Sequence, residues 1–225
     1  MCGRYLRRSD KQRIAEHFRI SGDMAELHPS YNVAPTDFQP VVRLERETGE
    51  RELALMRWGM VPYWAKSPKD LGISTINAKA ESLLAKALWK DPLERRRCLV
   101  IADGFYEWQR IDEKSKQPYA FALKDDEPFA FAGLWDRWKQ PDGNWLISFA
   151  IITTGPNELT AKVHNRMPVI LKPADYNRWL TPSINEPPPV DLLRPYDADK
   201  MKAWKVGKEV GNVRNNSPEL CAEWT

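Results

Sequence analysis

The chain has 225 residues, of which 42% are hydrophobic and 10 are tryptophans, so it can bury a substantial core as a single domain over residues 1–225. Its formal net charge of +3 permits nucleic-acid binding but does not argue for it, because a local basic patch matters more than the total. Three widely spaced cysteines and only three histidines argue against a structural zinc site. The lack of a long apolar run argues against a secretory signal and a membrane span.

The N-terminal part predicts a short helix followed by an ordered loop. Residues 9–19 have the composition of a helix that begins at Ser9 as its N-cap, with Ile14 and Phe18 on one apolar face. The segment HPSYNVAPTDFQP, residues 28–40, is rich in turn formers and predicts the ordered loop.

The rest of the chain alternates between short strands and a few helices. Two alternating runs on either side of ETGE predict a hairpin over residues 40–62. From Ala78, AKAESLLAKALWK has the period and composition of a helix. Further strands are predicted at 98–108, 117–123, 128–138, 145–154 and 167–171 and from Lys202, with short helices over 155–164 and 173–180. This pattern indicates an α+β fold, a single domain with a curled, barrel-like, mainly antiparallel sheet core flanked by short helices.

The chain begins with MCGRY, in which a cysteine follows the initiator methionine. If Met1 is removed, Cys2 carries both an α-amine, which titrates near pH 7.7–8.0, and a thiol, which titrates near 8.5. Such an amine can form a Schiff base with an aldehyde, and the neighbouring thiol can then close a five-membered thiazolidine. The alternative is that Cys2 follows Met1 by chance and has no function there.

Two further positions have polar side chains in places that suit catalysis. Asn77 lies where a strand or loop gives way to the predicted helix, so it either caps that helix or orients a nucleophile or a substrate oxygen. Glu107 lies in an aromatic-rich strand between Phe105 and Trp108. Desolvation there would raise the pKa of its carboxyl and suit it to proton transfer near neutrality. The alternative for Glu107 is an exposed position on an alternating strand.

His164 and Arg166 follow a short predicted helix and precede an apolar strand. In extended geometry, two residues apart, their side chains would share one face. Histidine is the natural acid or base near pH 7 and arginine a natural phosphate ligand, although a lone histidine is often structural. None of these features forms a GxSxG, HExxH or Walker A motif, so nucleotide hydrolysis has no support.

Taken together and in order, segments that cover nearly the whole chain resemble the SRAP family (SOS response-associated peptidase). The segments are MCGRY at 1–5, YNVAPT at 31–36, RWGMVPYW at 57–64, TINAKAES at 75–82, CLVIADGFYEW at 98–108, KQPYAFAL at 116–123, FAGLWD at 131–136, IITTGPNELTAKVHNRMPVIL at 151–171 and VGNVRNNSPEL at 210–220. A match of this breadth is far more specific than any single feature.

The resemblance implies a protein that binds single-stranded DNA and crosslinks to abasic sites through an N-terminal cysteine exposed by loss of Met1. The ring-opened sugar of an abasic site is the aldehyde that an aminothiol traps. The resemblance implies that Cys2 is the nucleophile, that Asn77 orients its amine and the sugar, and that Glu107 moves protons. It also implies that His164 assists ring opening and Schiff-base chemistry. A Schiff base at the sugar favours β-elimination of the 3′ phosphate, so AP lyase activity is expected.

DNA contacts are expected from groups close to these segments. The cations expected on phosphates flanking the lesion are Arg4, Lys79 and Arg166, which would make affinity fall with salt. The residues expected to stack on bases or wedge between them are Pro35, Tyr63 and Trp64, with Trp108 lining the same cleft. Two departures from the family stand here: Lys79 replaces a frequent arginine, and residues 64–65 read WA where some members have a second aromatic.

Two other functions remain open from the sequence. One is a thiol peptidase or self-processing amidase that uses Cys2, and the other is a non-covalent single-strand binder. We expect a monomer without metal, cofactor or membrane contact, whose partner is single-stranded DNA containing abasic sites. The cysteine usage fits a reducing compartment, so we expect a cytoplasmic protein, nucleoid-associated if bacterial. We expect Cys98 to be a buried strand residue and Cys221 to be incidental.

Overall fold

Five strands close into a barrel in the computed structural model, which describes residues 2–21, 24, 26–68 and 75–224. The ring order is β10 (Trp145–Thr154), β4 (Arg51–Trp58), β3 (Phe38–Leu44), β6 (Arg97–Ala102) and β9 (Phe129–Lys139), which pairs again with β10. The β10–β4 pair is parallel and the other four pairs are antiparallel. The predicted barrel-like, mainly antiparallel α+β core is therefore confirmed.

Three short strands extend the barrel at its edges. β5 (Asn77–Lys79) pairs with β10 in parallel from Ile151 onward, directly beyond the point where β4 stops pairing at Phe149. β11 (Met167–Pro168) pairs with the end of β10, and β12 (Ile170–Leu171) pairs with β9. The end of β10 is thus flanked by β5 and β11 where the barrel wall opens.

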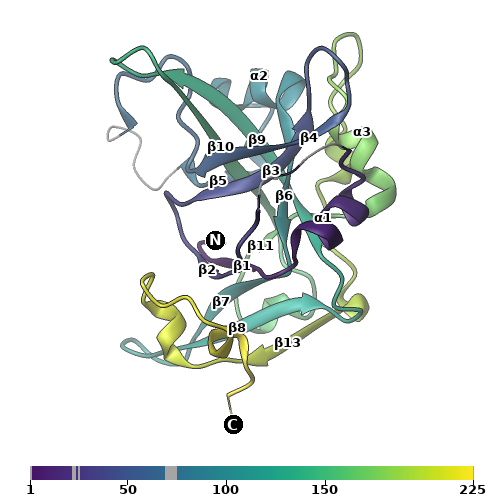
Figure 1. The fold of residues 1–225 in the computed structure, drawn as a ribbon. Helices are drawn as coiled ribbons and strands as arrows, with labels where there is room; N and C mark the ends of the chain where they lie inside the picture. Colours follow the sequence, from purple (N-terminus) through teal and green to yellow (C-terminus); the bar gives the residue numbers. More distant parts are fainter. Residues whose placement is uncertain (1, 22–23, 25, 69–74, 225) are drawn as a thin grey trace.

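A second, wholly antiparallel sheet lies beneath the barrel (Figure 1). Its order is β13 (Met201–Lys205), β8 (Lys116–Leu123), β7 (Gly104–Arg110), β1 (Tyr5–Arg7) and β2 (Ser30–Val33). In the ribbon, β1 and β2 lie between the barrel strands and the lower strands β7, β8 and β13. The start of the chain therefore enters between the two sheets.

The two faces of β7 contact different cores because side chains alternate along a strand. Phe105 belongs to the cluster that fills the barrel, together with Cys2, whereas Tyr106 and Trp108 pack with the C-terminal segment. Gly104 allows this close packing, since a Cβ there would lie 2.7 Å from the backbone oxygen of Phe121. Glu107, two residues after Phe105, shares the face that is turned to the barrel.

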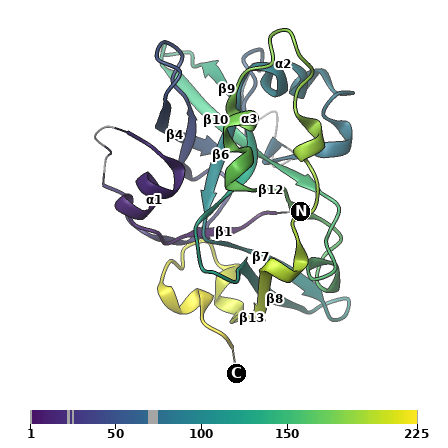
Figure 2. The same ribbon diagram turned by 90° about the vertical axis from the view of Figure 1, so that its right-hand side faces the viewer.

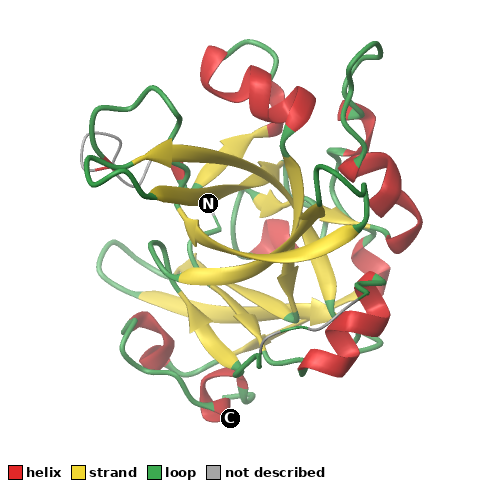
Figure 3. Cartoon of the chain, turned by 45° about the horizontal axis from the view of Figure 1, so that its top comes forward, coloured by secondary structure: helices red, strands yellow, loops and turns green. Residues whose placement is uncertain are grey.

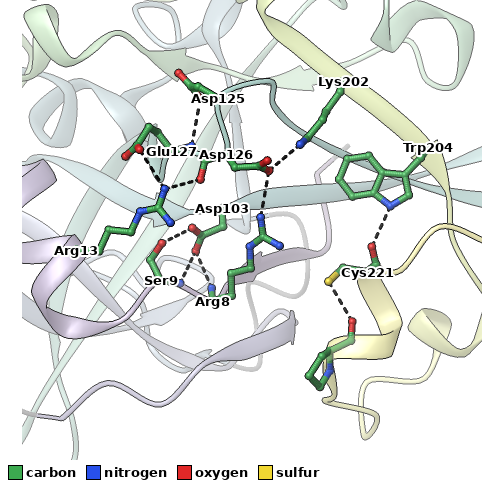
Figure 4. Close-up of polar contacts among 11 residues, drawn as sticks. Arg8, Ser9, Arg13, Asp103, Asp125, Asp126, Glu127, Lys202, Trp204 and Cys221 are labelled. Atoms are coloured by element: carbon green, nitrogen blue, oxygen red, sulfur yellow. Dashed lines mark hydrogen bonds and ion pairs between the residues drawn. The ribbon is translucent and has the colours of Figure 1, made fainter.

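The first helix, α1 (Lys11–Phe18), buries its predicted apolar face. Its N-cap is Asp10, whose side chain accepts a hydrogen bond from the backbone N–H of Arg13 at 2.8 Å. The prediction of Ser9 as N-cap is therefore wrong. The Ser9 hydroxyl instead donates to the buried carboxylate of Asp103 (Figure 4).

The helix predicted from Ala78 is wrong over its first half. β5 is followed by the 3-10 turn η3 (Ala80–Ser82), and α2 (Ala87–Arg95) begins only later. The free edge of β10 beyond β4 supplies ladder hydrogen bonds that outweigh helix propensity here. Similarly, part of the predicted loop at 28–40 forms β2 and the start of β3.

The remaining helical segments are short. The helix predicted over 155–164 is reduced to the 3-10 turn η4 (Thr160–Lys162), whereas α3 (Tyr176–Leu180) follows η5 (Pro173–Asp175) as expected. The other 3-10 turns are η6 (Val190–Leu192), η7 (Ala198–Lys200), η8 (Lys208–Gly211) and η9 (Pro218–Cys221). Figures 2 and 3 show the helices around the outside of the strands. Within the described residues, no helix is both long and apolar enough to span a membrane.

Candidate active site

Cys2 lies at the entry of β1, between the barrel and the lower sheet, and its side chain is fully buried. Burial, with a smaller contribution from the charge of Glu107, raises the pKa of its thiol above the usual range. The side-chain amide of Asn77 donates a 2.8 Å hydrogen bond to the carbonyl oxygen of Cys2. Met1, whose removal we expect, lies outside the described residues.

Asn77 is held by β5 rather than at a helix cap. Its side chain is buried, and its Oδ1 atom accepts no hydrogen bond from the described residues. Because the amide nitrogen is used on Cys2, the amide plane is fixed and Oδ1 remains as an acceptor beside the start of the chain. A buried acceptor without a donor is uncommon in folded proteins and suits a group that completes its hydrogen bonds with substrate.

Glu107 comes from the barrel-facing side of β7, opposite Tyr119 of β8 in the sheet register. Its side chain is buried, and desolvation raises the pKa of the carboxyl to about 7. The predicted desolvated carboxyl with a raised pKa is confirmed. At neutral pH such a group exists in both protonation states, so it can accept and return a proton.

His164 follows η4 and brings its imidazole to Glu107. Its Nδ1 accepts a 3.0 Å hydrogen bond from the backbone N–H of Arg166 and lies 3.2 Å from the carbonyl oxygen of the same residue; we assign the proton of the neutral ring to Nε2 because the contact with the N–H is the shorter one. Nε2 lies 4.0 Å from Oε2 of Glu107, and burial lowers the pKa of His164. The Gln109 side chain, which donates to the carbonyl of Lys162 at 2.8 Å, ties this segment to β7.

Arg166 does not share a face with His164 in extended geometry, because the chain bends at Asn165 between them. Its guanidinium donates to both carboxylate oxygens of Glu81, at 2.7 and 3.0 Å, and to the carbonyl of Thr153 at 2.6 Å. Lys79 is exposed and pairs in register with Thr153, so both cations lie at the end of β10.

The other two groups expected to contact DNA from near β1 and β7 lie on the opposite side of β7 from Glu107. Arg4 donates to Asn32 Oδ1 and to the carbonyl of Val210, both at 2.9 Å. Its guanidinium lies 5.9 Å from the ring centroid of Trp108, which packs with the C-terminal segment. The side chains of Arg4 and Trp108 therefore pack with the C-terminal segment, on the other side of β7 from Phe105 and Glu107.

The aromatic side chains predicted in loops are exposed. Tyr63 and Trp64 expose 67% and 57% of their side chains, and Pro35 lies half-buried in the turn between β2 and β3. The loop backbone is anchored, since the N–H of Tyr63 donates to Asp136 at 3.1 Å and the Trp138 indole donates to the carbonyl of Ala65. Rigid backbone with exposed rings is a suitable surface for stacking.

Glu81 and Thr153, which bind Arg166, were not predicted from the sequence. Glu81 lies within TINAKAES, so a carboxylate shortly after Asn77 and Lys79 was the available signal. The described residues contain no cluster of three or more His, Cys, Asp or Glu side chains that could hold a metal ion. Cys98 is buried in β6 as predicted, and Cys221 is half-buried in η9.

Comparisons with known proteins agree on one family. The profile of the family described as SOS response associated peptidase (SRAP) matches residues 1–213. The chain is 45% identical over 223 residues to "Abasic site processing protein YoqW" of Bacillus subtilis (strain 168), and the match covers 98% of both chains. It is 34% identical to "Abasic site processing protein HMCES" of Xenopus tropicalis, and that match covers 89% of this chain and 68% of the relative. A crystal structure of a Bacteroides thetaiotaomicron protein superposes with a TM-score of 0.88 at 26% identity, covering all of both chains. The chain therefore belongs to the SRAP family.

Proposed function

We propose that this protein processes abasic sites in single-stranded DNA by forming a covalent crosslink through Cys2 after Met1 is lost. The names of the SRAP relatives support the abasic site as substrate. The observation that carries the mechanism is the enclosure of Cys2 by Asn77, with Glu107 and His164 paired nearby. These groups suit the capture of an aldehyde.

The chemistry needs two nucleophilic steps at the sugar aldehyde. The α-amine of Cys2 adds to the aldehyde carbon, and loss of one water gives a Schiff base. The thiol sulfur then adds to the imine carbon, its proton leaves, and the imine nitrogen gains a proton as the thiazolidine closes. Splitting the reaction in this way is covalent catalysis in two easier steps.

Proton transfer is the part that the protein supplies. The thiol is protonated because burial raises its pKa, so it needs a base before it can close the ring. Glu107, with a pKa of about 7, takes that role. The Nε2–H of His164 donates a hydrogen bond to the sugar oxygen during ring opening. Asn77 Oδ1 accepts from the amine and keeps its lone pair directed at the aldehyde.

AP lyase activity competes with ring closure in this scheme. The Schiff base acidifies the neighbouring carbon, and loss of a proton there expels the 3′ phosphate. The slower the thiol closes the ring, the more strand cleavage results. A variant that keeps the amine and lacks the thiol is therefore a lyase without a stable crosslink.

DNA contact in this proposal starts with the exposed Lys79 and Trp64 and the half-buried Pro35. Arg4 and Arg166 hold internal partners and would have to exchange them for phosphates. The protein acts as a monomer on one strand.

The peptidase alternative has less support. A cysteine nucleophile for amide bonds needs a lowered thiol pKa, whereas burial raises that of Cys2.

The test is a denaturing gel of the protein with a single-stranded oligonucleotide that contains one abasic site. We expect a heat-stable shifted band that is absent with intact oligonucleotide and with Cys2→Ala. Cys2→Ser retains the amine, so it should cleave the strand and give a band only after borohydride reduction. If the wild-type protein, with its N-terminal cysteine verified by mass spectrometry, gives no band, the proposal is wrong.

A further inference from the structure

Two exposed apolar side chains lie on the outer face of the β3–β4 pair. Phe38 exposes 51% of its side chain and Leu55 exposes 65%. They share one face, because Phe38 pairs with Arg57 and Pro40 pairs with Leu55 in the antiparallel register. An exposed aromatic ring on a strand that is paired with β4 offers a flat contact surface.

The neighbour of Phe38 across the strands is a cation without an acidic partner. The Arg57 guanidinium donates to the carbonyl of Gly59 at 2.9 Å, and within the described residues it forms no ion pair. Burial lowers its pKa, but an arginine remains charged at neutral pH. Phe38 and Arg57 are thus cross-strand neighbours, and among the described residues the guanidinium has no acidic partner.

This pair lies next to the turn that carries Pro35, a residue expected to contact DNA. The turn that carries Pro35 is bonded to the end of β4, since the N–H of Thr36 donates to Trp58 O and the N–H of Trp58 donates to Asp37 O, both at 2.9 Å. Phe38 follows that turn directly.

The spacing along β10 gives the distance to the reacting end of the chain. Arg57 is in register with Ser148 and Asn77 with Ile151. Three residues of strand place the two about 10 Å apart along β10. Their side chains leave opposite faces of the sheet, so a DNA strand that reaches both must pass around the end of β4.

We propose that Phe38 and Arg57 form a subsite for one nucleotide next to the lesion, with its base stacked on Phe38 and its phosphate on Arg57. This subsite rests on the proposed function. A nucleotide fits better than an apolar partner because the ring is accompanied by a cation that has no acidic partner among the described residues. A two-fold contact between copies of this chain would bring two such cations together.

The first experiment measures which base Phe38 contacts. In a Cys2→Ala background, binding is measured to single strands with a stable abasic-site analogue, with each flanking base removed in turn. We expect removal at one position to weaken binding about tenfold. In Phe38→Ala, removal of the base at that position, and at no other, should leave binding unchanged. In Phe38→Tyr, removal of that base should again weaken binding. Trp145→Ala, at a 52% exposed aromatic on the far part of β10, is the matched control.

The second experiment measures the phosphate contact. Arg57→Met should reduce the slope of log affinity against log salt by about 0.7, the value for one phosphate of a single strand. Arg95→Met, at an exposed cation on α2, should leave the slope unchanged.

Three outcomes decide the inference. If Phe38→Ala shows no coupling to any base position while the Cys2-intact protein still crosslinks, the subsite is wrong and the proposed function stands. If the wild-type protein self-associates in solution and Phe38→Ala abolishes this, Phe38 forms a contact between copies of the chain and the subsite is wrong. If the Cys2-intact protein does not crosslink at all, the proposed function itself fails, and the subsite with it.

Discussion

At the scale of single residues, the raised pKa of Glu107 links catalysis to stability. Burial raises this pKa from 4.5 to about 7, so the folded state binds a proton that the unfolded state releases. The favourable contribution is complete below pH 4.5 and is lost as pH rises through 7. At one pKa unit per 1.36 kcal/mol, the ionised carboxyl costs about 3 kcal/mol above pH 7.

Glu107→Gln should therefore stabilise the fold at pH 8 and abolish efficient crosslinking. The amide keeps the shape and removes the buried charge, so its advantage over wild type should disappear at pH 5. Urea unfolding at both pH values measures the difference, and the abasic-site gel measures the activity. Equal stabilisation at both pH values would contradict a raised pKa in the folded protein.

The desolvation of the Glu107 carboxyl was predictable from the sequence, but its contact with His164 was not. Aromatic neighbours in the sequence place Glu107 in an apolar strand, so its desolvation follows from local composition. The contact with His164 depends on η4 and on the bond between Gln109 and Lys162, which no local pattern encodes. The extended geometry predicted for His164 and Arg166 fails because the Arg166 N–H folds back onto the imidazole.

Arg166 gives a second prediction at this scale. Its guanidinium is bound by both oxygens of Glu81, an exposed carboxylate, so the proposed contact of Arg166 with a phosphate requires Glu81 to release it. Glu81→Gln should strengthen binding to single strands and steepen the salt dependence by about 0.7 in log units. Glu47→Gln removes the same charge from the exposed β3–β4 turn and is the matched control. Weaker binding in Glu81→Gln would mean that the carboxylate positions Arg166 for DNA.

At the scale of elements, one buried cation joins two helices to the barrel. Arg97, at the start of β6, donates to the carbonyls of Leu93 and Glu94 at the end of α2. It also donates to the carbonyls of Trp179 in α3 and of Thr181, which directly follows α3. Burial lowers its pKa to about 10. One planar guanidinium thus satisfies the last carbonyls of both helices.

Arg97→Lys should lower the free energy of unfolding by about 2–3 kcal/mol, because one ammonium cannot reach both helix ends and leaves buried carbonyls unpaired. Thermal unfolding measures this loss. Arg95→Lys, at an exposed position of the same basic run, should change stability little. Crosslinking below the unfolding temperature should be retained in both, since neither helix end contacts Cys2. A loss as small as that of the control would show that water replaces the guanidinium.

The elements themselves were predictable where patterns are local. Alternation predicts β3, β4, β8, β9 and β10, and the buried face of α1 follows from its period. The segment after Asn77 was predicted wrongly because its composition favours a helix, while the open edge of β10 makes it a strand. That edge exists only because β4 ends at Trp58, which is a property of the assembled sheet.

At the scale of the whole molecule, the C-terminal segment holds the start of the chain in place. The buried Asn32 donates to the carbonyls of Asn212 and Asn215 at 3.0 and 2.9 Å and accepts from Arg4 at 2.9 Å. Arg4 in turn donates to Val210. The strand pairings that close the predicted barrel and this connection between the two ends are non-local, so no local sequence pattern predicts them.

Asn32→Ala should therefore affect both stability and reaction at Cys2. It leaves two carbonyls and one guanidinium donor without partners, a loss of about 2–3 kcal/mol. Because Arg4 is two residues from Cys2, we also expect slower crosslinking at a temperature where the variant is fully folded. Asn144→Ala, which removes an exposed turn amide, is the control for both measurements. Destabilisation with an unchanged crosslinking rate would show that Asn77 alone positions Cys2, and that the C-terminal segment stabilises the fold without tuning the site.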